Sequence, residues 1–115
     1  MLLLLRQTRI AKLLNMSVEK NIVLALKQVH DPEIPVNVYD LGLIYDIRVD
    51  ENKKAFIKMT LTAPNCPMAD QLLQDVYDAV MDVPTIEDVA IELTFDPPWS
   101  KNRMSEEALL ELGLL

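Results

Sequence analysis

The stretch that decides the fold runs from Leu43 to Val80 and reads LIYDIRVDENKKAFIKMTLTAPNCPMADQLLQDVYDAV. Its first part alternates apolar and polar residues over 43–49 and again over 55–62, with a polar turn between the two runs. A period of two predicts half-buried strands, which here form an antiparallel hairpin with one face toward the core. After Pro67 the apolar residues recur every three or four positions, so an amphipathic helix is expected to follow.

The alternation also predicts which side chains point inward. The expected inward residues are Leu43, Tyr45, Ile47 and Val49 in the first strand and Ala55, Ile57, Met59 and Leu61 in the second. Thr60 and Thr62 then fall on the opposite face, close to Cys66 along the chain. In the turn, Asn52 is the residue that tolerates a positive φ.

Three further elements lie on either side of this stretch. An apolar stripe from Val18 to Val29 predicts a first helix, which Asp31-Pro32 ends because the residue before proline avoids the helical region. Residues 86–95 contain a third expected strand. Its inward residues are predicted to be Val89, Ile91, Leu93 and Phe95. A short last helix is expected from about Ser105 and ends before Gly113.

Together these elements predict an α/β fold of the α+β type. The domain has two layers, the element order α-β-β-α-β-α, and a small mixed three-stranded sheet with helices on one face. Because the second and third strands flank a helix, a right-handed parallel crossover is expected to join them. The order of the strands in the sheet is left open.

Composition limits the classes of ligand that the chain can bind. At 115 residues it forms one domain, and its net charge of −7 argues against nucleic acid, which requires a basic face. With only two glycines, Gly42 and Gly113, neither of the common glycine-rich phosphate loops can be written, so no nucleotide is expected. A single cysteine rules out an internal disulfide and fits the reducing cytoplasm.

The first 16 residues differ in pattern from the rest of the chain. The apolar run Leu2 to Leu5 is followed by the cations Arg6, Arg9 and Lys12, and it is too short for a signal peptide or a membrane span. We expect residues 1–16 to be an N-terminal extension, either disordered or a short basic helix, and residues 17–115 to be the working domain.

Cys66 lies between the predicted second strand and the predicted second helix, directly before Pro67. Proline suits the first position of a helix, so the thiol is expected at or next to the N-cap. There the unpaired N–H groups and the positive end of the helix dipole favour the thiolate, which binds metals or attacks electrophiles. The alternative is an inert structural cysteine.

The loop Asp31-Pro32-Glu33-Ile34-Pro35 is stiffened by two prolines. In one interpretation Asp31 caps local backbone groups and Glu33 is solvated. In the other, both carboxylates line a cleft that they share with Cys66, because carboxylate and thiolate are both ligands of iron and zinc.

Besides Cys66, two residues are the only ones of their type in the chain, and each has two interpretations. His30, at the end of the first helix, is expected to be a partner of the helix dipole rather than a ligand or base. Trp99, beside two prolines, is expected to anchor a loop by packing rather than to contact a partner.

Several ordered motifs resemble the SufT-type iron–sulfur assembly family, also called PaaD-like or metal–sulfur cluster biosynthetic. They are Asp31-Pro32-Glu33 with Pro35, the run from Tyr39 to Tyr45, Thr60-Leu61-Thr62 before Cys66-Pro67, and Asp96-Pro97-Pro98-Trp99 with Leu112-Gly113. The resemblance covers residues 17–115. It implies a role in delivering or inserting clusters into client apoproteins, in partnership with other iron–sulfur assembly proteins.

The resemblance also implies roles for individual residues. Cys66 would be a cluster or iron ligand, or a reactive thiolate, and Asp31 and Glu33 would shape its pocket. Thr60 and Thr62 would donate hydrogen bonds to sulfur. Asp40, in the second signature run, completes the set of expected binding residues.

Two departures limit what the resemblance implies. Longer relatives carry a fused P-loop ATPase, so a separate ATPase partner is expected here. Relatives that serve ring-hydroxylating oxygenases have further C-terminal cysteines that this chain lacks.

The number of available ligands favours a carrier. A cluster usually takes four cysteines, whereas one chain offers one and a homodimer two, so any bound cluster or iron would be labile or completed by a partner. We do not expect an enzyme. The alternatives are a small cysteine-nucleophile enzyme and an interaction adaptor without metal chemistry.

Overall fold

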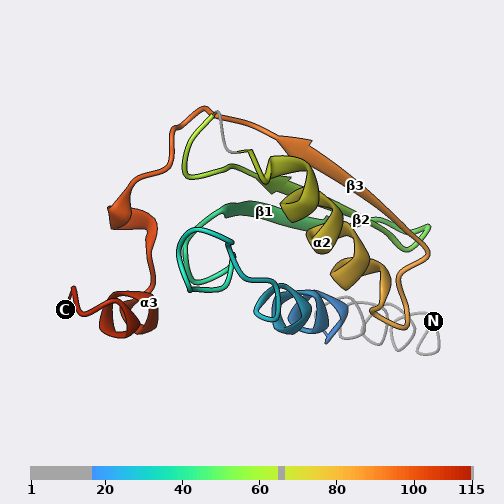
Figure 1. Ribbon diagram of the computed structural model, residues 1–115. Helices are drawn as coiled ribbons and strands as arrows, with labels where there is room; N and C mark the ends of the chain where they lie inside the picture. The colour runs from blue at the N-terminus through green and yellow to red at the C-terminus, as the bar shows by residue number, and fades with distance from the viewer. Residues whose placement is uncertain (1–16, 65–66, 115) are drawn as a thin grey trace.

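The computed structural model describes residues 17–64 and 67–114. The first helix includes residues 17–26. It is followed by β1 (Ile44–Val49), β2 (Lys54–Met59), α2 (Ala69–Met81), β3 (Asp88–Leu93), the 3-10 helix η1 (Lys101–Arg103) and α3 (Glu106–Glu111) (Figure 1). The predicted element order α-β-β-α-β-α is confirmed, with η1 as an addition.

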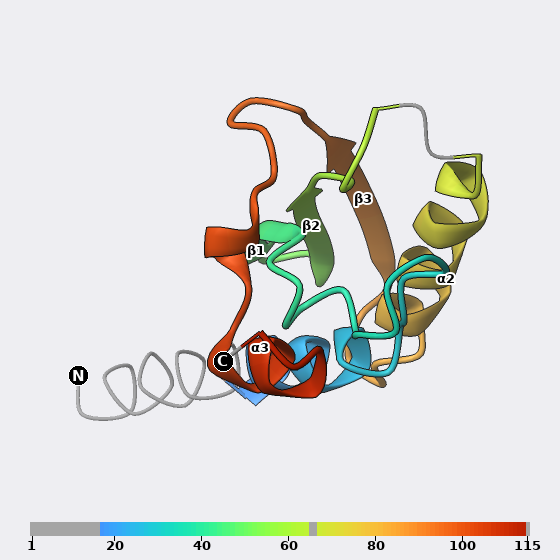
Figure 2. The ribbon, with the colours of Figure 1, turned by 60° about the vertical axis from the view of Figure 1, so that its left-hand side comes forward.

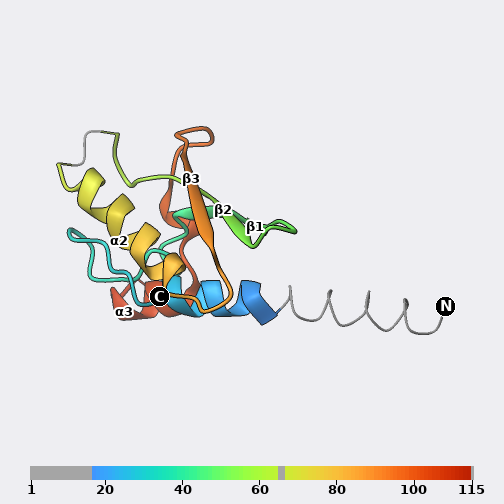
Figure 3. The same cartoon turned by 90° about the vertical axis from the view of Figure 1, so that its right-hand side faces the viewer.

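The three strands form one mixed sheet in the order β1-β2-β3. β1 pairs with β2 in antiparallel fashion and β2 pairs with β3 in parallel, so the predicted hairpin and parallel crossover are both confirmed. The helix over 17–26 and α2 lie against one face of the sheet, as the views in Figures 2 and 3 show. The opposite face carries half-buried Phe56 and Lys58 and is left open by these helices.

The hydrophobic core lies between the sheet and these helices. The expected inward residues of the second strand are all buried, and Leu43 is fully buried as well. From the helical layer, Ile22 and Leu26 of the first helix and Leu72, Val76 and Val80 of α2 complete this core. The period-two prediction therefore holds best for the central strand, β2.

Both edge strands depart from the predicted set of buried residues. In β1 the register shifts between Ile44 and Asp46, and this bulge turns Tyr45 to the open face of the sheet instead of the core. At the other edge, Leu93 and Phe95 remain 38% and 40% exposed, because they lie at and beyond the end of β3. In the hairpin turn the positive φ falls on Lys53 (61°), not on Asn52.

The ends of the later helices were predicted with mixed success. The N-cap of α2 is Met68, so Pro67 is not the first helical residue as expected, and Cys66 precedes the N-cap by two positions. At α3 the expectation is confirmed, because the Ser105 hydroxyl accepts a hydrogen bond from the Ala108 N–H. Gly113 follows this helix with φ +73°. Among the helices of residues 17–64 and 67–114, none has the length and apolar character of a membrane span.

Candidate functional site

Asp31 organises the proline-stiffened loop from inside. Its side chain is only 5% exposed, and Oδ1 accepts hydrogen bonds from the backbone N–H groups of Glu33 (2.8 Å) and Ile34 (3.0 Å). Of the two interpretations of this loop, local capping by Asp31 is therefore observed. The same contacts leave the Glu33 side chain exposed to solvent.

Asp40 lies in a second polar cluster. Its Oδ2 accepts a 2.7 Å hydrogen bond from the Asn37 side-chain amide, and its own N–H donates to Asn37 Oδ1. The Asp40 carbonyl oxygen accepts from the backbone N–H of Ser105, 2.8 Å away. Asp40 therefore ties the loop before β1 to the segment that leads into α3.

The two threonines differ in accessibility. Thr60 is fully buried, with its hydroxyl 3.5 Å from the carbonyl oxygen of Leu61, whereas Thr62 is half-buried. Cys66 lies outside the described residues, so its distance to either hydroxyl stays a matter of prediction. Its described neighbours Pro64, Pro67 and Met68 are all exposed.

Among the residues that the structure describes, no three histidines, cysteines or acidic residues lie close enough together to hold a metal ion. Within the same residues, no hydrogen bond joins Asp31, Asp40 and Thr60 to one another. Among the described residues, the predicted site residues are thus not joined to one another into one hydrogen-bonded site. His30 is exposed, with its Nδ1 3.3 Å from the Gln28 carbonyl oxygen.

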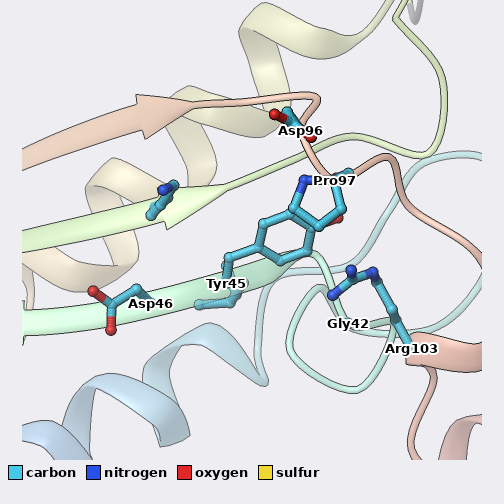
Figure 4. Close-up of a pocket in the computed structure, with 8 residues that line it drawn as sticks. Gly42, Tyr45, Asp46, Asp96, Pro97 and Arg103 are labelled. Atoms are coloured by element: carbon cyan, nitrogen blue, oxygen red, sulfur yellow. The ribbon is translucent and has the colours of Figure 1, made fainter.

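A cavity that was not predicted from the sequence lies on the open face of the sheet. Its volume is about 490 Å³, and its walls include Tyr45, Asp46, Lys58, Asp96, Pro97 and Arg103 (Figure 4). We call it the charged cavity. The Arg103 guanidinium stacks over the Tyr45 ring, 4.6 Å from the ring centre. The alternating sequence pattern did not reveal this cavity, because it predicted that the Tyr45 side chain points into the core.

Two of the family motifs, the run from Tyr39 to Tyr45 and Asp96-Pro97-Pro98-Trp99, build the charged cavity. The Tyr45 hydroxyl donates to the Pro97 carbonyl oxygen at 2.8 Å, and the Trp99 indole N–H donates to the Leu41 carbonyl oxygen at 2.6 Å. The expected anchoring role of Trp99 is confirmed, since its side chain also packs against the core. Gly42, with φ +81°, lies directly against the backbone of Arg103. Both motifs were recognised in the sequence, but only the structure shows that they converge at this cavity.

Comparison with known proteins identifies the family. The profile of the family described as iron–sulfur cluster assembly protein matches residues 19–93. The chain belongs to this family. The resemblance based on the sequence motifs is thereby confirmed.

Relatives match this assembly-family protein over most of its length. It is 56% identical to an "Fe-S protein maturation auxiliary factor" of Porphyromonas gingivalis, over 84% of this chain and 92% of the relative. The factor YitW of Bacillus subtilis is 39% identical over 85% of this chain and 96% of its own length.

A solved structure shares the fold of this assembly-family protein. A domain of unknown function from Bacillus anthracis superimposes with a TM-score of 0.84 at 38% identity, covering 90% of this chain and 99% of that domain.

Proposed function

We propose that this protein helps to mature iron–sulfur proteins by passing clusters to client apoproteins, with Cys66 as a transient ligand. The observation that carries the proposal is the 56% identity, over 84% of the chain, to a protein named an Fe–S protein maturation auxiliary factor. A factor named SufT of Staphylococcus aureus, 36% identical over 73% of this chain, supports the same role.

The cluster is treated as cargo that the protein holds briefly. A thiolate is a strong ligand for iron, but one cysteine supplies one of the four ligands that a cluster usually takes. The remaining ligands would come from a partner protein, a small thiol or a second copy of the chain. Incomplete ligation makes a bound cluster labile, and lability favours transfer.

The other predicted residues would support Cys66. Glu33 is the carboxylate of its loop that stays exposed, and the capping bonds of Asp31 hold the backbone beneath it, which supports Glu33 as the group that faces cargo. Thr62 is the more accessible threonine, which favours it as a hydrogen-bond donor to sulfur. Thr60 and Asp40 would act through positioning, since both are engaged inside the protein.

Cluster delivery would also require partners. The chain matches an iron–sulfur cluster carrier protein of Synechocystis at 28% identity but covers only 23% of that protein. This supports a small unit that works with separate assembly proteins, among which we include a P-loop ATPase. We place the protein in the cytoplasm, since its lone cysteine suits a reducing compartment.

A substitution in living cells tests the proposal. Cys66→Ser replaces the thiol by a poor iron ligand, whereas Ala63→Ser adds a hydroxyl at an exposed position of the same segment and serves as the control. Cells that rely on the Cys66→Ser protein should show reduced activity of iron–sulfur enzymes at equal protein abundance. Full activity in those cells would show that Cys66 is not the cargo ligand.

A further inference from the structure

The free edge of β1 is the feature that remains unexplained. β1 lies at one end of the strand order, and its neighbour on the other side is β2. Among the described residues, no backbone group of Ile44–Val49 makes a hydrogen bond to anything except β2. Within that part of the chain, the outward-facing N–H and C=O groups of this strand have no partner, so they can pair with another extended segment.

Hollows follow this edge on both faces of the sheet. On the helix side lies a mostly apolar groove of about 530 Å³, lined by Glu19, Lys20, Val23 and Leu24 of the first helix together with Tyr39 and Ile47. On the open side lies the charged cavity. A smaller hollow lined by Tyr39, Ile47 and Tyr45, among others, links the two around the edge. We call the groove lined by Val23, Leu24, Tyr39 and Ile47 the helix-side groove.

An added strand would send its side chains into both hollows. Ile47 pairs with Ile57, which is buried on the helix side, whereas Asp46 pairs with Lys58 on the open side. Consecutive residues of a strand point to opposite faces. A segment paired with β1 would therefore place alternate side chains in the helix-side groove and in the charged cavity.

The distribution of lysines and arginines indicates which side chains of an added strand would fit the open face. Residues 17–115 hold eight lysines and arginines, because three of the 11 in the chain precede residue 17. Six of the eight lie on the hairpin and η1, and residues 59–100 contain none. The only ion pair in the described residues joins Lys54 and Asp88, so Lys58 and Arg103 have no carboxylate within ion-pair distance there.

The directions of the side chains in the charged cavity favour an acidic ligand. In Figure 4 the Arg103 side chain points toward the Tyr45 ring and the Asp46 side chain points away from it, while Asp96 lines the same cavity beside Pro97. Stacking on Tyr45 holds the guanidinium in place and leaves its N–H groups at the edge of the ring stack free for an acceptor.

We propose that β1 binds an extended segment of a partner protein as a fourth strand, in which apolar and acidic residues alternate. The apolar side chains enter the helix-side groove and the carboxylates meet Lys58 and Arg103. Residues 1–16 of the chain itself are a poor match, because they contain three cations and no acidic residue. The proposal goes beyond cluster delivery and does not depend on Cys66.

A peptide titration tests this surface. The probe is an acetylated and amidated octapeptide, Thr-Val-Glu-Val-Glu-Val-Glu-Thr, added to the isotope-labelled full chain and followed by the amide NMR signals. The expected result is a set of shifts centred on Ile44–Val49 and Leu24. The matched control peptide carries lysine in place of glutamate and should bind at least fivefold more weakly.

Two pairs of variants assign the contacts. Removing the two cations that would pair with the peptide carboxylates, in the double variant Lys58→Gln with Arg103→Gln, should weaken binding about fivefold. Lys53→Gln removes a cation from the same hairpin outside the hollows and should leave affinity unchanged. Leu24→Ser should weaken binding, whereas Leu110→Ser, at an equally exposed position (61% for both leucines), should not.

Three outcomes would overturn the proposal: equal binding of the acidic and basic peptides, shifts centred on β3 instead of β1, or a concentration-dependent dimer that occupies the edge with a second copy. Cys66→Ser should bind the acidic peptide as the wild type does. If the wild type fails to bind the acidic peptide, only the proposed docking surface is wrong. If Cys66→Ser still supports full activity of iron–sulfur enzymes, only the proposed function is wrong.

Discussion

Gly42→Ala is the substitution whose effect can be worked out most completely. Gly42 has φ +81°, a conformation that costs an L-residue about 1–2 kcal/mol. A Cβ atom built at this position would also collide with the Arg103 carbonyl oxygen and lie 2.7 Å from the Arg103 Cβ. Overpacking of this kind costs about 1–3 kcal/mol, because the contacting backbone must move. We expect a total loss of about 3 kcal/mol in the free energy of unfolding.

Gly113→Ala provides a matched control for the backbone part of this loss. Gly113 has a similar φ of +73°, but a Cβ there would have no atom within 4 Å. Its replacement should cost about 1–2 kcal/mol, from conformation alone. The difference between the two variants therefore isolates the contact between Gly42 and Arg103.

Guanidinium denaturation of the full chain measures both values. Trp99 is the only tryptophan, and it lies in the segment that Gly42 holds against β1, so its fluorescence reports on this contact directly. Gly42→Ala should unfold at the lower denaturant concentration of the two. Equal destabilisation by the two substitutions would refute the reasoning, because it would mean that the segment before α3 can move away at no cost.

Other substitutions test the loop, the anchor and the core by the same unfolding measurement. Asp31→Ala should cost about 1–3 kcal/mol, since it leaves the N–H groups of Glu33 and Ile34 without their acceptor; a loss below about 0.5 kcal/mol would contradict the capping role. Trp99→Phe, followed by circular dichroism, should cost about 1 kcal/mol through the lost indole hydrogen bond, and an unchanged midpoint would speak against the anchor. Leu72→Ala, at 2% exposure in α2, should cost about 3 kcal/mol, and a small loss would mean that the core rearranges around the cavity.

The sequence predicted the fold correctly in elements that have a single periodic pattern and a single buried face. β2 is flanked by strands on both sides and covered on one face, so strict alternation described it correctly. α2 shows the helical period over its whole length, since its buried side chains Leu72, Val76 and Val80 are four residues apart. The family motifs also predicted the assembly family correctly, because several of them occurred in the expected order.

The charged cavity could not be predicted, for two physical reasons. A bulge in β1 changes the face of a side chain without changing the residue pattern, so Tyr45 still looked like a core residue. The cavity also depends on long-range bonds such as Tyr45 to Pro97, which are separated by 52 positions and leave no local period. At β3, alternation described which face Leu93 belongs to but could not show whether any helix covers it.

The most direct test of the account is whether the Cys66 sulfur holds cluster cargo. Wild type, Cys66→Ser and Ala63→Ser would each be incubated anaerobically with iron and sulfide and weighed by native mass spectrometry. The account predicts added mass equal to a cluster or its iron on wild type and on Ala63→Ser, and its loss from Cys66→Ser with the fold intact. The same added mass on all three proteins would contradict it.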